Sequence, residues 1–322
     1  MAEGTFRRDR ILTNMSIRRS AGKMIAELVA PVVPMDDQSG YFPIFGPENI
    51  TPQEDIRAPG TEATPARWSV TDQAYKIDGH AMKDKVARER QRDAGPNWDL
   101  IQATTLNLTD KRILNKEVAF VALLAAGMTG TSLAAQTGTP WNDDDEDPIA
   151  LIKAQRLACI LRGYGAPNIF AVSAPVWDAI TLNANVRGLA TGAPDAQASV
   201  VKPDDFARLI GVDEVIVGEG VYNTAAEGQA ASGAWIWGEY ALLAVRPASP
   251  APMIPSLAYH LAWRNALEVL TGDREQQIIQ GYRLVERYWW QPIKADVVEV
   301  HEFIEGKITC MAAGCLFSDC IA

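Results

Sequence analysis

The sequence lacks any run of apolar residues long enough to cross a bilayer, for which about 18 in succession are needed. Its opening residues, Met1 to Arg10, contain no apolar core that could serve as a signal peptide. These absences argue against a membrane partner. We therefore expect the chain to be made and folded in a cytoplasm.

Catalytic signatures are also missing. The three histidines are far apart in the sequence: His80, His260 and His301. No phosphate loop of the form G-x-x-x-x-G-K-[ST] is present, and Gly218-x-Gly220 lacks the third glycine of a dinucleotide site. We therefore expect no enzymatic activity, no cofactor and no bound metal. A soluble hydrolase with an atypical site is the alternative from another functional class.

The chain has the composition of a globular protein, with 48% apolar and 22% charged residues among 322. Its net charge of −10 argues against a protein whose whole surface binds nucleic acid, because such binding neutralises phosphates. Residues 1–24 differ from the rest, with six basic against two acidic side chains. This basic arm is expected to dock on an acidic surface, such as that of a neighbouring copy, or else to be a solvated tail.

Four cysteines are present, and three of them stand near the end of the chain with the spacing C-x4-C-x4-C. These three are Cys310, Cys315 and Cys320. This spacing matches no zinc site, so we interpret the three as buried structural thiols. Disulfides between subunits, formed after release into an oxidising medium, are the alternative. Cys159 stands alone in an apolar helical run and is expected to be buried.

Residues 31–65 contain seven prolines, which prevent helix and favour an extended chain that needs hydrogen-bond partners on another surface. Residues 68–82 then alternate as strand material, and residues 76–92 hold six basic and three acidic side chains. This pattern predicts a long polar hairpin that projects from the body. A solvated surface hairpin without a partner is the alternative.

Residues 97–126 contain neither proline nor glycine and carry apolar residues at three- and four-residue intervals. They predict one helix of roughly 45 Å that serves as a spine for a sheet. A second helix is predicted from Pro148 to about Gly163. Asp147 is its expected N-cap, which explains the acidic run before it better than a calcium site does.

The remaining chain alternates short elements without a regular βαβ repeat, which predicts an α+β fold. Helices are expected to start at Ser173-Pro175 and at Pro203. Strands are expected at 168–173, 212–218, 235–245, 257–263, 278–288 and 295–303.

This order of elements resembles a tailed-bacteriophage major capsid protein of the Hong Kong 97 type. Short segments from about residue 20 to 300 carry the resemblance, and their order and spacing together are specific. They are Ala30-Pro31-Val32-Val33-Pro34 with Gly40-Tyr41-Phe42-Pro43, Arg57-Ala58-Pro59-Gly60-Thr61-Glu62-Ala63, Thr109-Asp110-Lys111, Trp177-Asp178-Ala179, Val217-Gly218, Val221-Tyr222-Asn223-Thr224-Ala225 and Ile236-Trp237-Gly238.

The resemblance implies a Hong Kong 97-type fold in four parts. These are an N-terminal arm (1–45), an extended loop (46–95), a peripheral domain with the spine helix (96–149 and 266–322) and an axial domain (150–265). It implies a structural subunit that self-assembles as hexamers and pentamers into an icosahedral shell around double-stranded phage DNA. The implied location is the virion capsid, assembled in the cytoplasm of the host bacterium.

Portal, scaffolding and decoration proteins are the other partners that the resemblance implies, and the early start of the arm places any scaffolding in a separate protein. An acidic body suits a container that repels packed DNA. Contacts between subunits are expected from side chains of the extended loop: Arg57, Glu62, Lys83, Lys85 and Arg88. An encapsulin-type bacterial nanocompartment, which holds protein cargo in the same fold, is the alternative.

Overall fold

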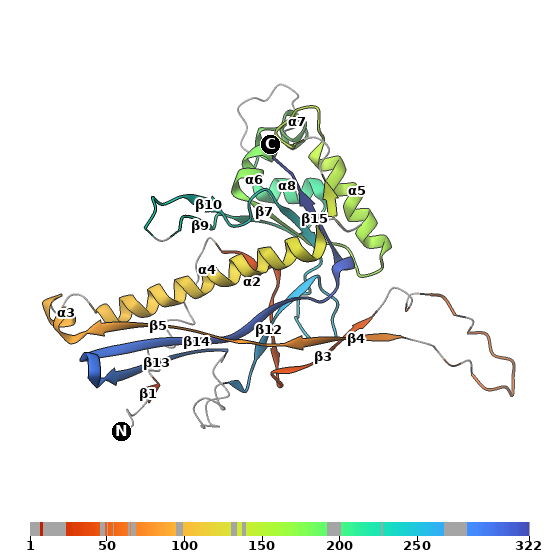
Figure 1. The fold of residues 1–322 in the computed structure, drawn as a ribbon. Coiled ribbons are helices and arrows are strands. Elements are labelled where there is room, and N and C mark those ends of the chain that lie inside the picture. The colour runs from red at the N-terminus through yellow and green to blue at the C-terminus, as the bar shows by residue number, and fades with distance from the viewer. Residues whose placement is uncertain are drawn as a thin grey trace.

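The computed structural model describes residues 7–8, 24–45, 49, 51–53, 55–63, 65, 69–94, 99–129, 134–136, 140–191, 201–226, 228–266 and 282–321. Two sheets joined by one long helix make up most of this part of the chain (Figure 1). A compact lobe holds one sheet, and a flatter, elongated part holds the other. Within the described residues, no helix is both long and apolar enough to cross a membrane.

The elongated part is a six-stranded sheet built around β14 (Ala295–Ile308). The first half of β14 lies between β13 (Arg283–Trp290) and β5 (Gly79–Ala87), and its second half pairs with β12 (Ala258–Trp263). These three pairings are antiparallel. The parallel strand β2 (Val32–Met35) closes one edge, and β1 (Arg7–Arg8) pairs with β13. Most of the basic arm before residue 24 lies outside the described residues.

The spine helix α4 (Leu100–Met128) runs along this sheet (Figure 1). The side chain of Asp99 caps it by accepting hydrogen bonds from the backbone N–H groups of Ile101 and Gln102, at 3.0 and 3.2 Å. The predicted 97–126 helix is confirmed, with a shift of two to three residues. Gly127, expected to end the helix, lies inside it, at a point where an added Cβ would meet Cδ1 of Ile308 at 2.7 Å.

The compact lobe holds a five-stranded sheet in the order β6 (Ala134–Gln136), β15 (Gly314–Ser318), β11 (Ala241–Ala244), β7 (Ile169–Ser173) and β8 (Glu214–Gly218). One face packs against helices α5 (Pro148–Leu161), α6 (Ala174–Leu182) and α8 (Pro203–Ile210). The other face rests on the C-terminal end of α4 and on the short helix α2 (Ala26–Val29). Both faces are therefore apolar, and every described residue of β7 and β11 is buried.

Three helix boundaries follow the local signals in the sequence. Asp147 caps α5 by accepting from the N–H groups of Ile149 and Ala150, and Pro148 occupies the first helical position. The hydroxyl of Ser173 caps α6. Gly211 ends α8 in the left-handed conformation, with φ +76°. The remaining short helices are α3 (Arg88–Asp93), α7 (Ala184–Thr191) and the 3₁₀ turns Gln291–Ile293 and Met311–Ala313.

The projecting hairpin differs from the predicted one. It consists of β3 (Ser39–Phe45) and β4 (Val70–Lys76), which pair with Phe45 opposite Val70, and a long connection extends far from the body (Figure 1). Residues 79–87, predicted as part of this hairpin, form β5 inside the six-stranded sheet. The prediction failed because a polar edge strand and a polar hairpin strand have the same alternation.

Several strands also lie in a different sheet from the one that the predicted domain ranges imply. The expected strand 235–245 is two strands, β11 and β10 (Gly233–Trp235), the latter paired with β9 (Val221–Asn223). β12 belongs to the sheet of the elongated part, although residue 265 was the expected boundary. β15 returns to the compact lobe, although residues 266–322 were assigned to the other domain. Part of the proline-rich segment finds its partner within the chain, since β2 pairs with β12.

Candidate functional site

The five predicted contact residues fall into two separate places. Arg57 and Glu62 are exposed in the connection between β3 and β4. Lys83 and Lys85 lie on β5, and Arg88 begins α3. The structure therefore does not bring the five together, and their contacts with other subunits stay a prediction.

Two of the five also interact within their own chain. The guanidinium carbon of Arg88 lies 3.9 Å from the ring centroid of Trp289, and its Nε lies 3.5 Å from a carboxylate oxygen of Asp296. The ammonium of Lys83 lies 6.0 Å from the ring centroid of Trp290. These contacts fix the two basic side chains beside the end of the β13–β14 hairpin.

All four cysteines are free and buried. Cys315 and Cys320 are 0% exposed and Cys310 is 7% exposed, so their sulfurs have little access to another subunit. Burial also raises the pKa of the Cys159, Cys310 and Cys320 thiols, which keeps them protonated and unreactive. Within the described residues, no three His, Cys, Asp or Glu side chains converge as metal ligands. These observations favour structural thiols over disulfides between subunits.

Intact assemblies are therefore expected to run as a single monomer band on a non-reducing denaturing gel. A thiol reagent such as dithionitrobenzoate should react slowly with the native protein and with all four cysteines after unfolding in guanidinium, because unfolding exposes them. Disulfide-linked dimers or larger species that disappear on reduction would contradict this expectation.

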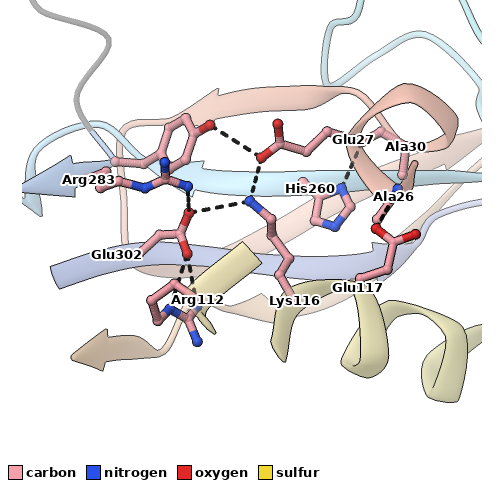
Figure 2. A network of polar contacts seen from close by, with 10 residues as sticks. Ala26, Glu27, Ala30, Arg112, Lys116, Glu117, His260, Arg283 and Glu302 are labelled. Atoms are coloured by element: carbon pink, nitrogen blue, oxygen red, sulfur yellow. Dashed lines mark hydrogen bonds and ion pairs between the residues drawn. The ribbon is translucent and has the colours of Figure 1, made fainter. Parts of the chain in front are cut away.

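Sequence reasoning missed a buried cluster of charges between the spine helix and the six-stranded sheet (Figure 2). Glu302 on β14 is 0% exposed and accepts from Arg112 at 2.9 and 3.2 Å and from Arg283 at 2.7 Å. The ammonium of Lys116 lies 3.3 Å from Oε1 of Glu302, the oxygen that also accepts from Arg283, whereas Arg112 donates to Oε2. Burial alone would raise the pKa of Glu302, but the three cations lower it to about 2. The carboxylate is therefore ionised and holds α4, β13 and β14 together.

The same face of the spine helix binds residues 25–27, which lie within the predicted N-terminal arm. Lys116 also pairs with Glu27 on α2, and the hydroxyl of Tyr282 lies 3.4 Å from the same carboxylate (Figure 2). Glu117 accepts from the backbone N–H groups of Ile25 and Ala26, at 3.0 and 2.7 Å. We call these contacts, together with the charge cluster around Glu302, the arm anchor.

Two further side chains complete the arm anchor. The indole N–H of Trp237 donates to Glu117 at 2.6 Å, which links the anchor to the compact lobe. His260 on β12 lies with Nδ1 2.7 Å from the carbonyl oxygen of Ala30, so Nδ1 carries the hydrogen. Burial lowers the pKa of His260 to about 4, which keeps the ring neutral at pH 7. Burial raises the pKa of Glu117, against the opposing effect of its three donors.

Acid is expected to weaken the arm anchor through His260. Its pKa is depressed in the folded chain, so the unfolded chain binds more protons between pH 6.5 and 4, and stability is lost as the pH falls through this range. Glu27, Lys116 and Glu302 are the charged groups that act on it. Between pH 7 and 4, the unfolding free energy should fall by about 3 kcal/mol more in the wild type than in His260→Gln, which does not titrate. Urea titrations at each pH measure this difference, and parallel profiles for the two proteins would contradict it.

Comparisons with known proteins support the predicted family resemblance. No protein family model matches the chain. The chain is 25% identical over 250 residues to a major capsid protein of Pseudomonas phage JBD67, covering 75% of this chain and 78% of the relative. It is 24% identical over 221 residues to the major capsid protein of Burkholderia phage BcepMu, covering 66% and 69%.

Solved structures match almost the entire chain. A phage-related protein from Bordetella bronchiseptica RB50 superposes with a TM-score of 0.75 at 21% identity and 98% coverage of both chains. The capsid of cyanophage P-SCSP1u superposes with a TM-score of 0.55 at 11% identity, covering 99% of this chain and 90% of the other. The chain has the Hong Kong 97-type capsid fold. The predicted fold class and the resemblance to phage major capsid proteins are confirmed.

The same fold also occurs in an encapsulin. The SrpI encapsulin of Synechococcus elongatus PCC 7942 superposes on this capsid fold with a TM-score of 0.55 at 14% identity, covering 99% of this chain and 91% of the other. Both relatives found by sequence are major capsid proteins of phages, which favours a phage capsid protein over an encapsulin.

Proposed function

We propose that the chain is the major capsid protein of a tailed phage or prophage, whose copies form the icosahedral shell around double-stranded DNA. The observation that carries the proposal is the capsid fold over nearly the full chain, together with two relatives named as major capsid proteins. Its role is structural, as a subunit of a shell.

The exposed parts of the chain support self-assembly. Between β3 and β4, residues 51–53 and 55–63 are exposed, and Ile56 is 82% exposed. Tyr41 on β3 is 73% exposed. Large apolar side chains on a projecting segment gain stability when another copy covers them. In this proposal, the connection between β3 and β4 lies across a neighbouring subunit, where Arg57 and Glu62 make charged contacts.

The four-part division of the chain follows from the same proposal, with boundaries adjusted to the sheets. The N-terminal arm leads into the arm anchor, and residues 39–76 form the extended loop. The peripheral domain consists of α4 with the six-stranded sheet, including β5 and β12. The axial domain is the compact lobe, including β15. Lys83, Lys85 and Arg88 then belong to the peripheral domain and contact a neighbour from there.

The partners other than copies of this chain also belong to the proposal. Hexamers and pentamers of this chain would leave one position for a portal, and scaffolding and decoration proteins would bind the shell from inside and outside. The net charge of −10 would repel the packed DNA, so the genome can leave without being held by specific contacts. Assembly would take place in the host cytoplasm, and the finished capsid would reside in the virion.

Electron microscopy of the purified full-length chain tests the proposal directly. Closed, uniform shells are expected after expression alone or with a scaffolding protein from the same genome. Particles from the native source should contain DNA and carry a portal and tail, whereas protein cargo inside tailless shells would favour a nanocompartment. A discrete monomer or dimer that never assembles, and that turns over a small substrate, would overturn the shell proposal.

A further inference from the structure

Helix α5 exposes an apolar stripe on the outer side of the compact lobe. Leu157 is 59% exposed, Leu161 is 87% exposed, and Ile160 beside them is 37% exposed. Lys153 is exposed one turn before Leu157. Residues four apart lie on one face of a helix about 6 Å from each other, so a charge and two leucines form one line. We call residues 153, 157, 160 and 161 the α5 stripe.

A second stripe of similar design lies on α6 and α7. Leu182 is 63% exposed and Leu189 is 57% exposed. Asp178 is exposed one turn before Leu182, as Lys153 is before Leu157. We call residues 178, 182 and 189 the α6–α7 stripe. The two stripes share the order of a charge followed by leucines, but the charges have opposite signs.

The two stripes lie on opposite flanks of the helical layer. α5 packs over β15, whereas α6 packs over β7 and β8 at the other end of the five-stranded sheet. α8 contacts both α5 and α7, and Figure 1 shows α5 and α6 on either side of it. One subunit therefore cannot bring its own stripes together. Contact between the stripes requires a second copy.

We propose that the α5 stripe of one copy packs against the α6–α7 stripe of the next copy. This inference rests on the proposed function and adds to it a specific interface between subunits. Such a contact joins different patches on the two partners, and copies related by a rotation that divides a full turn close into a ring. Lys153 pairs with Asp178 across the interface, and Leu157 packs against Leu182. The two helices then run in the same direction.

Charge complementarity supports a second copy as the occupant. α5 carries Lys153 and Arg156 and no acidic residue, whereas α6 carries Asp178 and no basic residue. The basic residue of α7, Arg187, donates to the carbonyl oxygen of Leu182 within its own chain. Within the described parts of the chain, neither Lys153 nor Asp178 has an ion-pair partner. Burying exposed leucines on both sides supplies the attraction, and the opposite charges select the register.

Charge reversal in a double-mutant cycle tests the interface. Lys153→Glu and Asp178→Lys each place like charges across it, so each single variant should reduce the assembled fraction at least about tenfold at a fixed protein concentration. The double variant restores an opposite pair and should assemble to within about threefold of the wild type. Sedimentation velocity with electron microscopy measures the assembled fraction. Circular dichroism and thermal unfolding of dissociated subunits confirm that these exposed substitutions leave the fold intact.

A matched control is available on the same layer of helices. Arg208 on α8 is 82% exposed and lies outside both stripes, so Arg208→Glu changes the charge equally and should assemble like the wild type. Single variants that assemble normally, or a double variant as poor as the single ones, would overturn the inference. Failure of the wild type to assemble at all would instead contradict the proposed function.

Cysteine crosslinking gives an independent readout. Because the native cysteines are buried, Leu157→Cys combined with Leu182→Cys should give, on oxidation, a ladder of multimers that ends at a closed ring. Each single cysteine variant should remain monomeric on the same gel. A double variant that stays monomeric when assembled and oxidised would overturn the inference.

Discussion

Replacement of Glu302 by alanine is expected to destabilise the subunit by about 3–5 kcal/mol, a large share of the stability of a typical domain. The carboxylate is fully buried and neutralises Arg112, Arg283 and Lys116. Its removal takes away the one carboxylate that contacts all three cations, and Lys116 keeps its ion pair with Glu27. Urea unfolding of dissociated subunits, followed by circular dichroism, measures the loss. The soluble yield is expected to fall with it.

Glu305 provides the matched control on the same strand. Its side chain is 42% exposed and lies 3.6 Å from a ring nitrogen of His80. Glu305→Ala removes the same chemical group from a solvated position, so the loss should stay below about 1 kcal/mol. If Glu302→Ala unfolded within 1 kcal/mol of the wild type, the charge cluster would not be what joins the spine helix to β13 and β14.

One residue of the arm anchor, Glu302, can be recognised in the sequence from the alternation of apolar residues along a strand. Val298, Val300, Glu302 and Ile304 alternate along β14, and all four are buried on one face. A carboxylate in such a series must be ionised beside cations or be protonated. Its partners could not be located in the same way, because Arg112 lies 190 residues away in the sequence. Only the packing of α4 on β14 brings the two together.

The sequence was sufficient to predict where a helix starts when that start depends on neighbouring side chains. Asp147 with Pro148, and Ser173 ahead of α6, fix helix starts through hydrogen bonds to residues two or three positions away. Strand partners depend on distant segments instead. β15 enters the compact lobe between β6 and β11, and β5 lies against β14, although neither pairing is encoded near the strand itself. The domain boundaries drawn from sequence order therefore crossed both sheets.

Removal of the connection between β3 and β4 is expected to abolish assembly while the subunit still folds. Phe45 pairs directly with Val70, so residues 46–69 can be replaced by Asn-Gly, which closes a two-residue hairpin turn. A shorter connection lowers the entropy lost on folding, and residues 51–53 and 55–63, which it removes, are exposed. The unfolding free energy should therefore not fall, and loop closure alone would raise it by about 2 kcal/mol. Shells should be absent by electron microscopy, because the exposed Ile56, Arg57 and Glu62 are lost.

A second replacement separates the sequence of the connection from its length. A Gly-Ser segment of the same length keeps the reach of the hairpin but lacks Ile56 and the charges, so it should fold and fail to assemble as the short turn does. Reversal of one charge, Arg57→Glu or Glu62→Lys, removes only part of the contact and should lower the assembled fraction without abolishing it. Normal shells from the Asn-Gly variant would show that neighbouring copies are joined elsewhere, by the compact lobes and the six-stranded sheets, and that the projecting hairpin contributes nothing to closure.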